Sequence, residues 1–101
     1  MPETKGPVPD AQLIEIFVKE ATQRLESLRD ALAFDDVRRA AREAHTLKSS
    51  STYFQAGDMR DAAAQLEEMA DKGQLGQAQP VLKKLEEAYA RLRDSLTKNR
   101  N

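Results

Sequence analysis

The chain has 101 residues, with 16 lysines and arginines against 17 aspartates and glutamates, which gives a net charge of −1. This length predicts one domain, and the balanced charge provides no overall attraction to nucleic acid or to an anionic membrane. The lack of cysteine excludes disulfides, and a single histidine makes a zinc site unexpected. No apolar run reaches the roughly 20 residues that a membrane span needs, so we expect a cytoplasmic protein.

Residues 1–9 are polar and rich in proline, which predicts a loose tail ahead of the folded part. From residue 10 onward good helix formers dominate and β-branched residues never alternate, so we predict an all-α fold. Asp10 is a suitable N-cap for the first helix, whose apolar residues recur at spacings of three and four. These residues are Ile14, Phe17, Val18, Ala21, Leu25, Leu28 and Leu32.

Leu13 and Ile16 lie off this stripe and add apolar surface near the start of the first helix. Two interpretations stay open at this stage. In one, a short extra N-terminal helix separates here and covers the end of the bundle. In the other, the two side chains form a docking patch for a partner.

A second helix is predicted after the break at residues 34–36, where either aspartate can cap it. Its inward face consists of Val37, Ala40, Ala41, Ala44, Leu47 and Ser51. A neighbouring polar face consists of Arg38, Arg42, His45, Ser49 and Thr52. His45 is therefore expected beside the core stripe and pointing outward, and Phe54 is expected to close this end of the bundle.

Residues 56–58 break the pattern again, and Asp58 is predicted to cap a third helix that Gly73 ends. Its stripe consists of Met59, Ala62, Ala63, Leu66, Met69 and Ala70. Pro80 suits the first turn of a fourth helix, with a face of Val81, Leu82, Leu85, Ala88, Tyr89, Leu92 and Leu96. Four stripes joined by short breaks predict an antiparallel up-down-up-down four-helix bundle over residues 10–97, with a frayed end at 98–101.

His45 is the candidate nucleophile of this chain. Imidazole titrates near neutrality, so a neutral, nucleophilic fraction exists at cytoplasmic pH, and a ring nitrogen can attack a phosphoryl donor to form a phosphoramidate. Lys48, one turn along, can supply a cation to the phosphoryl oxygens, and Ser49 can offer them a hydroxyl. Arg42, one turn back, adds longer-range attraction.

The second ring nitrogen of His45 must hold a proton if the first is to attack. A carboxylate from an adjacent helix is the usual way to fix that tautomer. Glu67, next to the core position Leu66 on the third helix, is the candidate for this role. Periodicity alone does not separate it from Glu68.

The run of residues 44–51, together with Ala56 and residues 66–67, resembles the signature of histidine-containing phosphotransfer domains. The similarity covers most of the chain, since residues 13–32 and 85–89 resemble the first long helix and the last helix of that family. These domains are four-helix bundles that relay phosphoryl groups between aspartates of response-regulator receiver domains.

The resemblance implies a role for three residues. His45 matches the phosphorylated histidine, and Lys48 matches the lysine that supports the phosphate. Glu67 matches a glutamate that hydrogen-bonds the phosphorylatable histidine in the related domain of chemotaxis kinases.

Two residues depart from the family pattern. Ser49 stands where the family usually has glycine, so its side chain either slows docking or adds a hydrogen bond to the phosphate. Gln55 stands where a helix-ending glycine is common, and Gly57 follows two places later. The end of the second helix is therefore expected to differ from the family pattern.

Together these features predict a monomeric phosphoryl carrier without kinase activity of its own. It accepts a phosphoryl group on His45 from a receiver aspartate and passes it to another. The expected partners are receiver domains or a hybrid histidine kinase, with Leu13, Ile16, Arg42 and Thr52 at the docking surface. We expect the chain to hold no cofactor or metal of its own, since the receiver supplies the magnesium ion. We also expect it to bind neither nucleic acid nor a membrane.

Two alternatives stay open. The chain could be the phospho-accepting domain of a chemotaxis-type histidine kinase, charged from ATP by a separate catalytic domain. It could also be a helical binding module that is never phosphorylated, in which case His45 would be dispensable.

Overall fold

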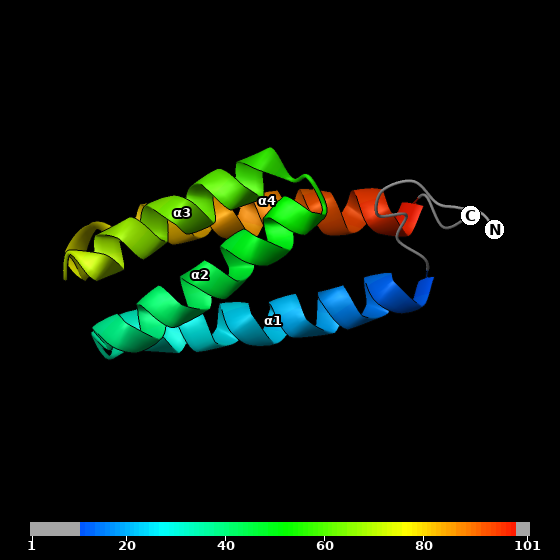
Figure 1. Cartoon of the computed structure of the whole chain (residues 1–101). Helices are drawn as coiled ribbons and strands as arrows, with labels where there is room; N and C mark the ends of the chain where they lie inside the picture. Colours follow the sequence, from blue (N-terminus) through cyan, green and yellow to red (C-terminus); the bar gives the residue numbers. More distant parts are fainter. Residues whose placement is uncertain (1–10, 99–101) are drawn as a thin grey trace.

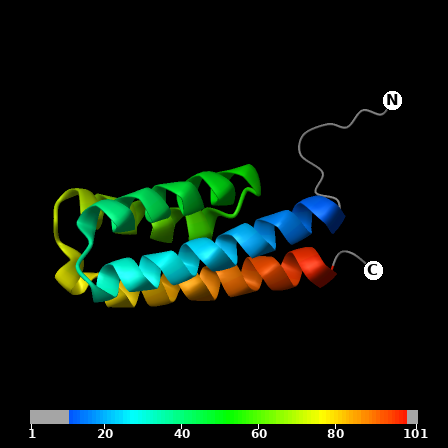
Figure 2. The same ribbon diagram turned by 90° about the horizontal axis from the view of Figure 1, so that it is seen from below.

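The computed structural model describes residues 11–98, in which four α-helices and a short 3₁₀ helix form an elongated bundle (Figure 1). The elements are α1 (Ala11–Ala33), α2 (Val37–Tyr53), α3 (Gly57–Asp71), the 3₁₀ helix η1 (Leu75–Gln77) and α4 (Gln79–Lys98). Short connections make each helix run back along the one before it, as Figure 1 and Figure 2 show. The predicted all-α four-helix bundle is confirmed.

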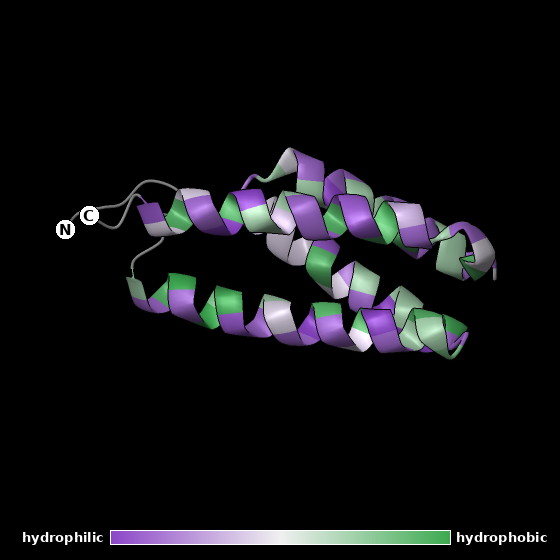
Figure 3. Cartoon of the chain, turned by 180° about the vertical axis from the view of Figure 1, so that it is seen from behind, coloured by the Kyte–Doolittle hydropathy of each residue, from purple (hydrophilic) through white to green (hydrophobic). Residues whose placement is uncertain are grey.

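The core lies between the helices, on the stripes that the sequence predicts. Figure 3 shows hydrophobic residues along the side of α1 that faces the other helices. The largest fully buried side chains are Leu28, Leu47, Ser51, Met59, Leu66 and Leu85. The predicted core residues Val18, Leu32, Val37, Ala41, Met69, Leu92 and Leu96 are only partly buried and pack against the rest. Phe54 closes its end of the bundle as predicted, since its ring centroid lies 4.4 Å from that of Phe17.

No separate helix precedes the bundle within residues 11–98. Leu13 and Ile16 belong to the first turns of α1, which runs without a break because residues 11–33 contain neither glycine nor proline. Of the two open interpretations, the one with a separate short helix at Leu13 and Ile16 is therefore wrong. Lys98, expected to fray, is the last residue of α4. The predicted tail and the Asp10 cap, like residues 99–101, lie outside the described residues.

Of the predicted N-caps, two fall on described residues, and one of these is right and the other wrong. Asp36 caps α2, because its carboxylate accepts the backbone N–H of Arg39 at 3.2 Å. At α3 the N-cap position is held by Ala56, without a side-chain hydrogen bond, and Asp58 lies inside the first turn. There its negative charge faces the positive end of the helix dipole and lies 3.4 Å from the guanidinium of Arg91 on α4.

Two residues after the end of each of the first three helices, the backbone takes a left-handed conformation. The residues concerned are Asp35 (φ 56°), Gln55 (φ 58°) and Gly73 (φ 67°). In each case the next backbone N–H returns to a carbonyl five residues earlier: Asp36 to Ala31, Ala56 to Ser51, and Gln74 to Met69. This closes the helix end in the manner that favours glycine. Gly73 therefore ends α3 as predicted, whereas Gln55 ends α2 at the cost of backbone strain.

A charged residue that the sequence pattern did not single out is buried in the bundle. Glu43 on α2 is 5% exposed. Its carboxylate accepts hydrogen bonds from Arg24 at 3.0 Å and from Ser27 at 2.8 Å, both on α1. The Ser27 hydroxyl in turn accepts from Nε of Arg39 at 2.9 Å. This polar network joins α1 to α2.

Candidate functional site

The packing of α2 determines where His45 points. Ala44 and Leu47 are fully buried in the core, so the helical period turns His45 outward between them. Its side chain is 60% exposed. The ring is therefore accessible to a partner while the helix that carries it is anchored at two neighbouring positions.

One carboxylate from α3 contacts both His45 and Lys48. Oε2 of Glu67 lies 2.8 Å from Nδ1 of His45, and Oε1 lies 2.7 Å from Nζ of Lys48. Glu67 follows Leu66, which is 1% exposed and fixes the rotation of α3. The neighbouring Glu68 turns away and pairs with Lys72 of its own helix at 3.0 Å. The structure thus separates the two glutamates that periodicity leaves equivalent.

Electrostatics keep the Glu67 carboxyl group ionised. The hydrogen bond from Lys48 holds the pKa of Glu67 below its ordinary value of 4.5, and the hydrogen bond from His45 adds to this, against the opposing effect of burial. An ionised carboxylate only accepts hydrogen bonds, so Nδ1 of His45 is the donor. In the neutral ring this leaves the lone pair on Nε2.

Nε2 of His45 is the nitrogen available for reaction. Within residues 11–98 it makes no hydrogen bond, and most of the ring is exposed. In the neutral form of the ring, the cluster of His45, Lys48 and Glu67 thus holds Nδ1 and leaves Nε2 available. Such an arrangement suits nucleophilic attack on an electrophile delivered from solvent or by a partner.

The other predicted site residues lie outside the contacts of this cluster. Ser49 and Arg42 are exposed on α2, one turn on either side of His45. Thr52 is also exposed, but its hydroxyl donates to the carbonyl of Lys48 at 3.0 Å. Leu13 and Ile16 lie on a different helix, at the start of α1, where Ile16 is 53% exposed.

Sequence analysis did not select Tyr53, the last residue of α2, as part of a surface. Its side chain is 48% exposed, and its ring packs edge-on against Phe54 with centroids 5.1 Å apart. Phe54 also contacts Phe17 of α1, so Tyr53 packs onto this aromatic contact between α1 and α2, and the exposed Ile16 precedes Phe17 in the chain. The paired aromatics at positions 53 and 54 are the sequence signal that could have indicated this.

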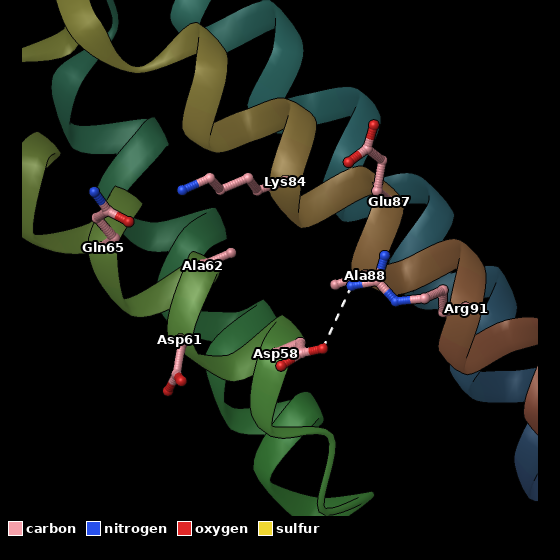
Figure 4. A pocket seen from close by; sticks show the side chains of 8 residues that line it. All are labelled: Asp58, Asp61, Ala62, Gln65, Lys84, Glu87, Ala88 and Arg91. Atoms are coloured by element: carbon pink, nitrogen blue, oxygen red, sulfur yellow. Dashed lines mark hydrogen bonds and ion pairs between the residues drawn. The ribbon is translucent and has the colours of Figure 1, made fainter.

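A groove between α3 and α4 lies apart from His45. It has a volume of about 270 Å³ and is lined by Asp58, Asp61, Ala62, Gln65, Lys84, Glu87, Ala88 and Arg91 (Figure 4). Its walls carry both signs of charge, and the ion pair between Asp58 and Arg91 spans it. Across residues 11–98 no group of three or more histidine, cysteine, aspartate or glutamate side chains could hold a metal ion.

A comparison with models of known protein families finds a match over most of the chain. The family model described as "Hpt domain" matches residues 12–95, from the first turn of α1 into the last turns of α4. No curated protein and no solved structure matches the chain. In the described part of the chain, none of the helices combines the length and apolarity that a membrane span requires.

Proposed function

Because the chain belongs to the Hpt domain family, the phosphotransfer modules of two-component signalling, we propose that it carries a phosphoryl group on His45 between two receiver domains. The donor is the phosphorylated aspartate of one receiver, and the acceptor is the aspartate of another. The observation that carries this proposal is the contact of Glu67 with Nδ1 of His45. It favours the tautomer in which the exposed Nε2 is the nucleophile.

The transfer step follows from that tautomer. The Nε2 lone pair attacks phosphorus, the bond between phosphorus and the aspartyl oxygen breaks, and its electron pair leaves on the aspartate carboxylate. The Nδ1 proton stays on the ring, where the ionised Glu67 offsets the positive charge that forms. Delivery to the second receiver is the same step in reverse.

Lys48 supplies the charge that the phosphoryl group requires. Its Nζ contacts the carboxylate of Glu67, which also contacts the ring of His45. The side chain of Lys48 is 34% exposed. A lysine one turn from the phosphorylated residue can turn its ammonium toward the phosphoryl oxygens and keep α2 undisturbed. In this proposal the magnesium ion belongs to the receiver, and the chain provides only the nucleophile and its local charge.

The docking surface in this proposal surrounds His45 on α2 and extends to the start of α1. Arg42 and Thr52 are exposed on α2, and Ile16 is exposed on α1 next to Leu13. The cation of Arg42 suits the acidic residues with which a receiver holds its metal ion. The apolar residues supply the area that a stable contact needs.

A second candidate function is favoured by the same contact. The glutamate that Glu67 matches belongs to the phospho-accepting domain of chemotaxis kinases, which a separate catalytic domain charges from ATP. Both functions use the same nucleophile and differ only in the donor. They are therefore separated by the donor that loads His45.

The experiment is phosphotransfer from a panel of phosphorylated receiver domains to the purified protein, with the His45→Gln variant in parallel. Acid-labile, base-stable label on the wild type and none on the variant is the expected result. Label only from ATP with a histidine kinase would support the second function. A folded protein that takes no label from either source would be a binding module that is not phosphorylated.

A further inference from the structure

The hydroxyl groups of α2 differ in how they are used. Thr46, Ser51 and Thr52 each donate to the backbone carbonyl four residues earlier, at 3.1, 2.6 and 3.0 Å. The hydroxyl of Ser49 makes no hydrogen bond within residues 11–98, and its side chain is exposed. Ser49 is thus an uncommitted donor one turn from His45.

Helix geometry directs this donor toward the histidine. Side chains on an α-helix lean toward its N-terminus, so the side chain at position 49 leans back over the turn that carries His45. Glu67 holds Nδ1 of the ring and also holds Lys48. A phosphoryl group on Nε2 would sit on the exposed side of the ring, where Ser49 is the nearby hydroxyl that no other group engages.

We propose that Ser49 is a phosphoryl-binding residue whose Oγ–H donates a hydrogen bond to a phosphoryl oxygen carried on Nε2 of His45. This inference rests on the proposed function and deepens it. In the unphosphorylated protein the hydroxyl has no hydrogen-bond partner within residues 11–98, whereas in the phosphorylated protein it meets a charged acceptor. Ser49 therefore shifts the equilibrium toward phosphohistidine, relative to the glycine usual at this position in the family it resembles.

The experiment uses phosphoramidate as a small donor, so that no partner surface affects the result. The Nε2 lone pair attacks phosphorus and the nitrogen–phosphorus bond of phosphoramidate breaks. Ammonia leaves with the protons that the protonated amine of phosphoramidate already carries, and the Nδ1 proton stays on the ring. At a fixed ratio of phosphoramidate to ammonia, the phosphorylated fraction gives the equilibrium constant. The variant Ser49→Ala removes only the hydroxyl and replaces serine by a better helix former, so it preserves the fold.

The matched control is Ser50→Ala. The hydroxyl of Ser50 also makes no hydrogen bond within the described residues, although the Ser50 carbonyl accepts from the backbone N–H of Phe54 at 3.2 Å. This position points about 100° further around α2 than Ser49, away from His45. We expect Ser49→Ala to lower the equilibrium constant roughly three- to tenfold, as the loss of one such hydrogen bond does. Ser50→Ala leaves it unchanged.

A second measurement distinguishes a direct contact of Ser49 with the phosphoryl group from an effect of Ser49 on the fold. A hydrogen bond to the phosphoryl dianion lowers its second pKa, so phosphorus NMR of Ser49→Ala should show that pKa raised, with the unfolding free energy not reduced. Equal constants for wild type and Ser49→Ala, or an equal fall in Ser50→Ala, would overturn the inference and leave the proposed function intact. If the folded wild type takes no label from phosphoramidate or from phosphorylated receivers, both are overturned.

Discussion

His45 and Lys48, one turn apart on α2, are held by the two oxygens of a single carboxylate, that of Glu67. The carboxylate therefore acts on both groups that the transfer step uses. It orients the imidazole through Nδ1, and it keeps the ammonium within reach of the ring. It also competes with a phosphoryl group for Lys48, so the lysine must exchange one anionic partner for another when His45 is loaded.

Replacing Glu67 should slow phosphotransfer in a graded way. Glu67→Gln keeps an oxygen that can accept from Nδ1 but loses the charge, so we expect a fall of a few-fold. Glu67→Ala removes both, and we expect a fall of roughly 10- to 100-fold, the range found when a group that orients a functional histidine is lost. The measurement is the single-turnover transfer rate from a phosphorylated receiver.

Glu68→Ala is the matched control for this series. It removes the neighbouring carboxylate, which pairs only with Lys72 in the described structure, and should leave the rate unchanged. Equal rates for Glu67→Ala and Glu68→Ala would show that the contact with Nδ1 has no part in the reaction.

The lowered pKa of Glu67 makes part of the folding stability depend on pH. A group whose pKa is lower in the folded protein binds more protons when unfolded, so its contribution is fully present above the ordinary value of 4.5. That contribution is lost as pH falls from there through the folded value. The difference in unfolding free energy between wild type and Glu67→Gln should therefore be constant near neutrality and shrink in acid.

Urea unfolding followed by circular dichroism, at pH 7 and at about pH 3, measures this difference. Other carboxylates titrate in both proteins and cancel in the comparison. A difference that does not change with pH would mean that the Lys48 and His45 contacts do not favour the ionised form of Glu67.

Glycine in place of Gln55 should relieve the backbone strain at the end of α2 and stabilise the fold. Gln55 has φ 58°, a conformation that costs a residue with a Cβ roughly 1 kcal/mol. Gln55→Gly is expected to raise the unfolding free energy by about 0.5 kcal/mol, since glycine also has more freedom in the unfolded chain. Thermal or urea unfolding checks this.

Gly73→Ala is the reciprocal test. Gly73 has φ 67° and nothing within 4 Å of where a Cβ would stand, so alanine adds backbone strain without a clash. We expect a loss of about 1 kcal/mol. Stabilisation by Gly73→Ala, or destabilisation by Gln55→Gly, would contradict the left-handed helix ends.

The exposed residues beside the aromatic contact of α1 and α2 should contribute to docking. Ile16→Ala removes apolar surface from a side chain that is 53% exposed, and we expect it to weaken receiver binding by about 1 kcal/mol, roughly fivefold in Kd. The control is Phe34→Ala, which removes a side chain that is 79% exposed in the turn between α1 and α2. Equal weakening by both variants would argue against a localised surface.

The sequence predicted the helices and their buried faces because apolar periodicity determines both. It could not separate Glu67 from Glu68, since that choice depends on how α3 is rotated against α2. It placed the α3 cap at Asp58 because aspartate is a good cap, but the left-handed Gln55 closes α2 through the backbone and α3 begins at Gly57. It left Glu43 aside because charged residues are usually exposed, and only the partners on α1 explain its burial.

Substitutions of Glu43 and of Glu67 should show opposite balances between loss of unfolding free energy and loss of phosphotransfer rate. The side chain of Glu43 is 7% exposed and pairs with Arg24, whose Nε is buried and has no hydrogen-bond partner among residues 11–98. Glu43→Gln removes the charge that compensates Arg24, and we expect it to destabilise the protein by roughly 1–3 kcal/mol, since Arg24 is partly solvated.

Phosphotransfer by the folded fraction of Glu43→Gln should nevertheless match the wild type, because Glu43 faces α1 and not the ring of His45. The two measurements are urea unfolding and the transfer rate at a temperature where both proteins are folded. Glu67→Ala should show the opposite balance, with a large loss of rate and a small loss of stability, because its carboxylate is partly exposed. A rate loss in Glu43→Gln equal to that in Glu67→Ala would mean that the network between α1 and α2 also positions the histidine.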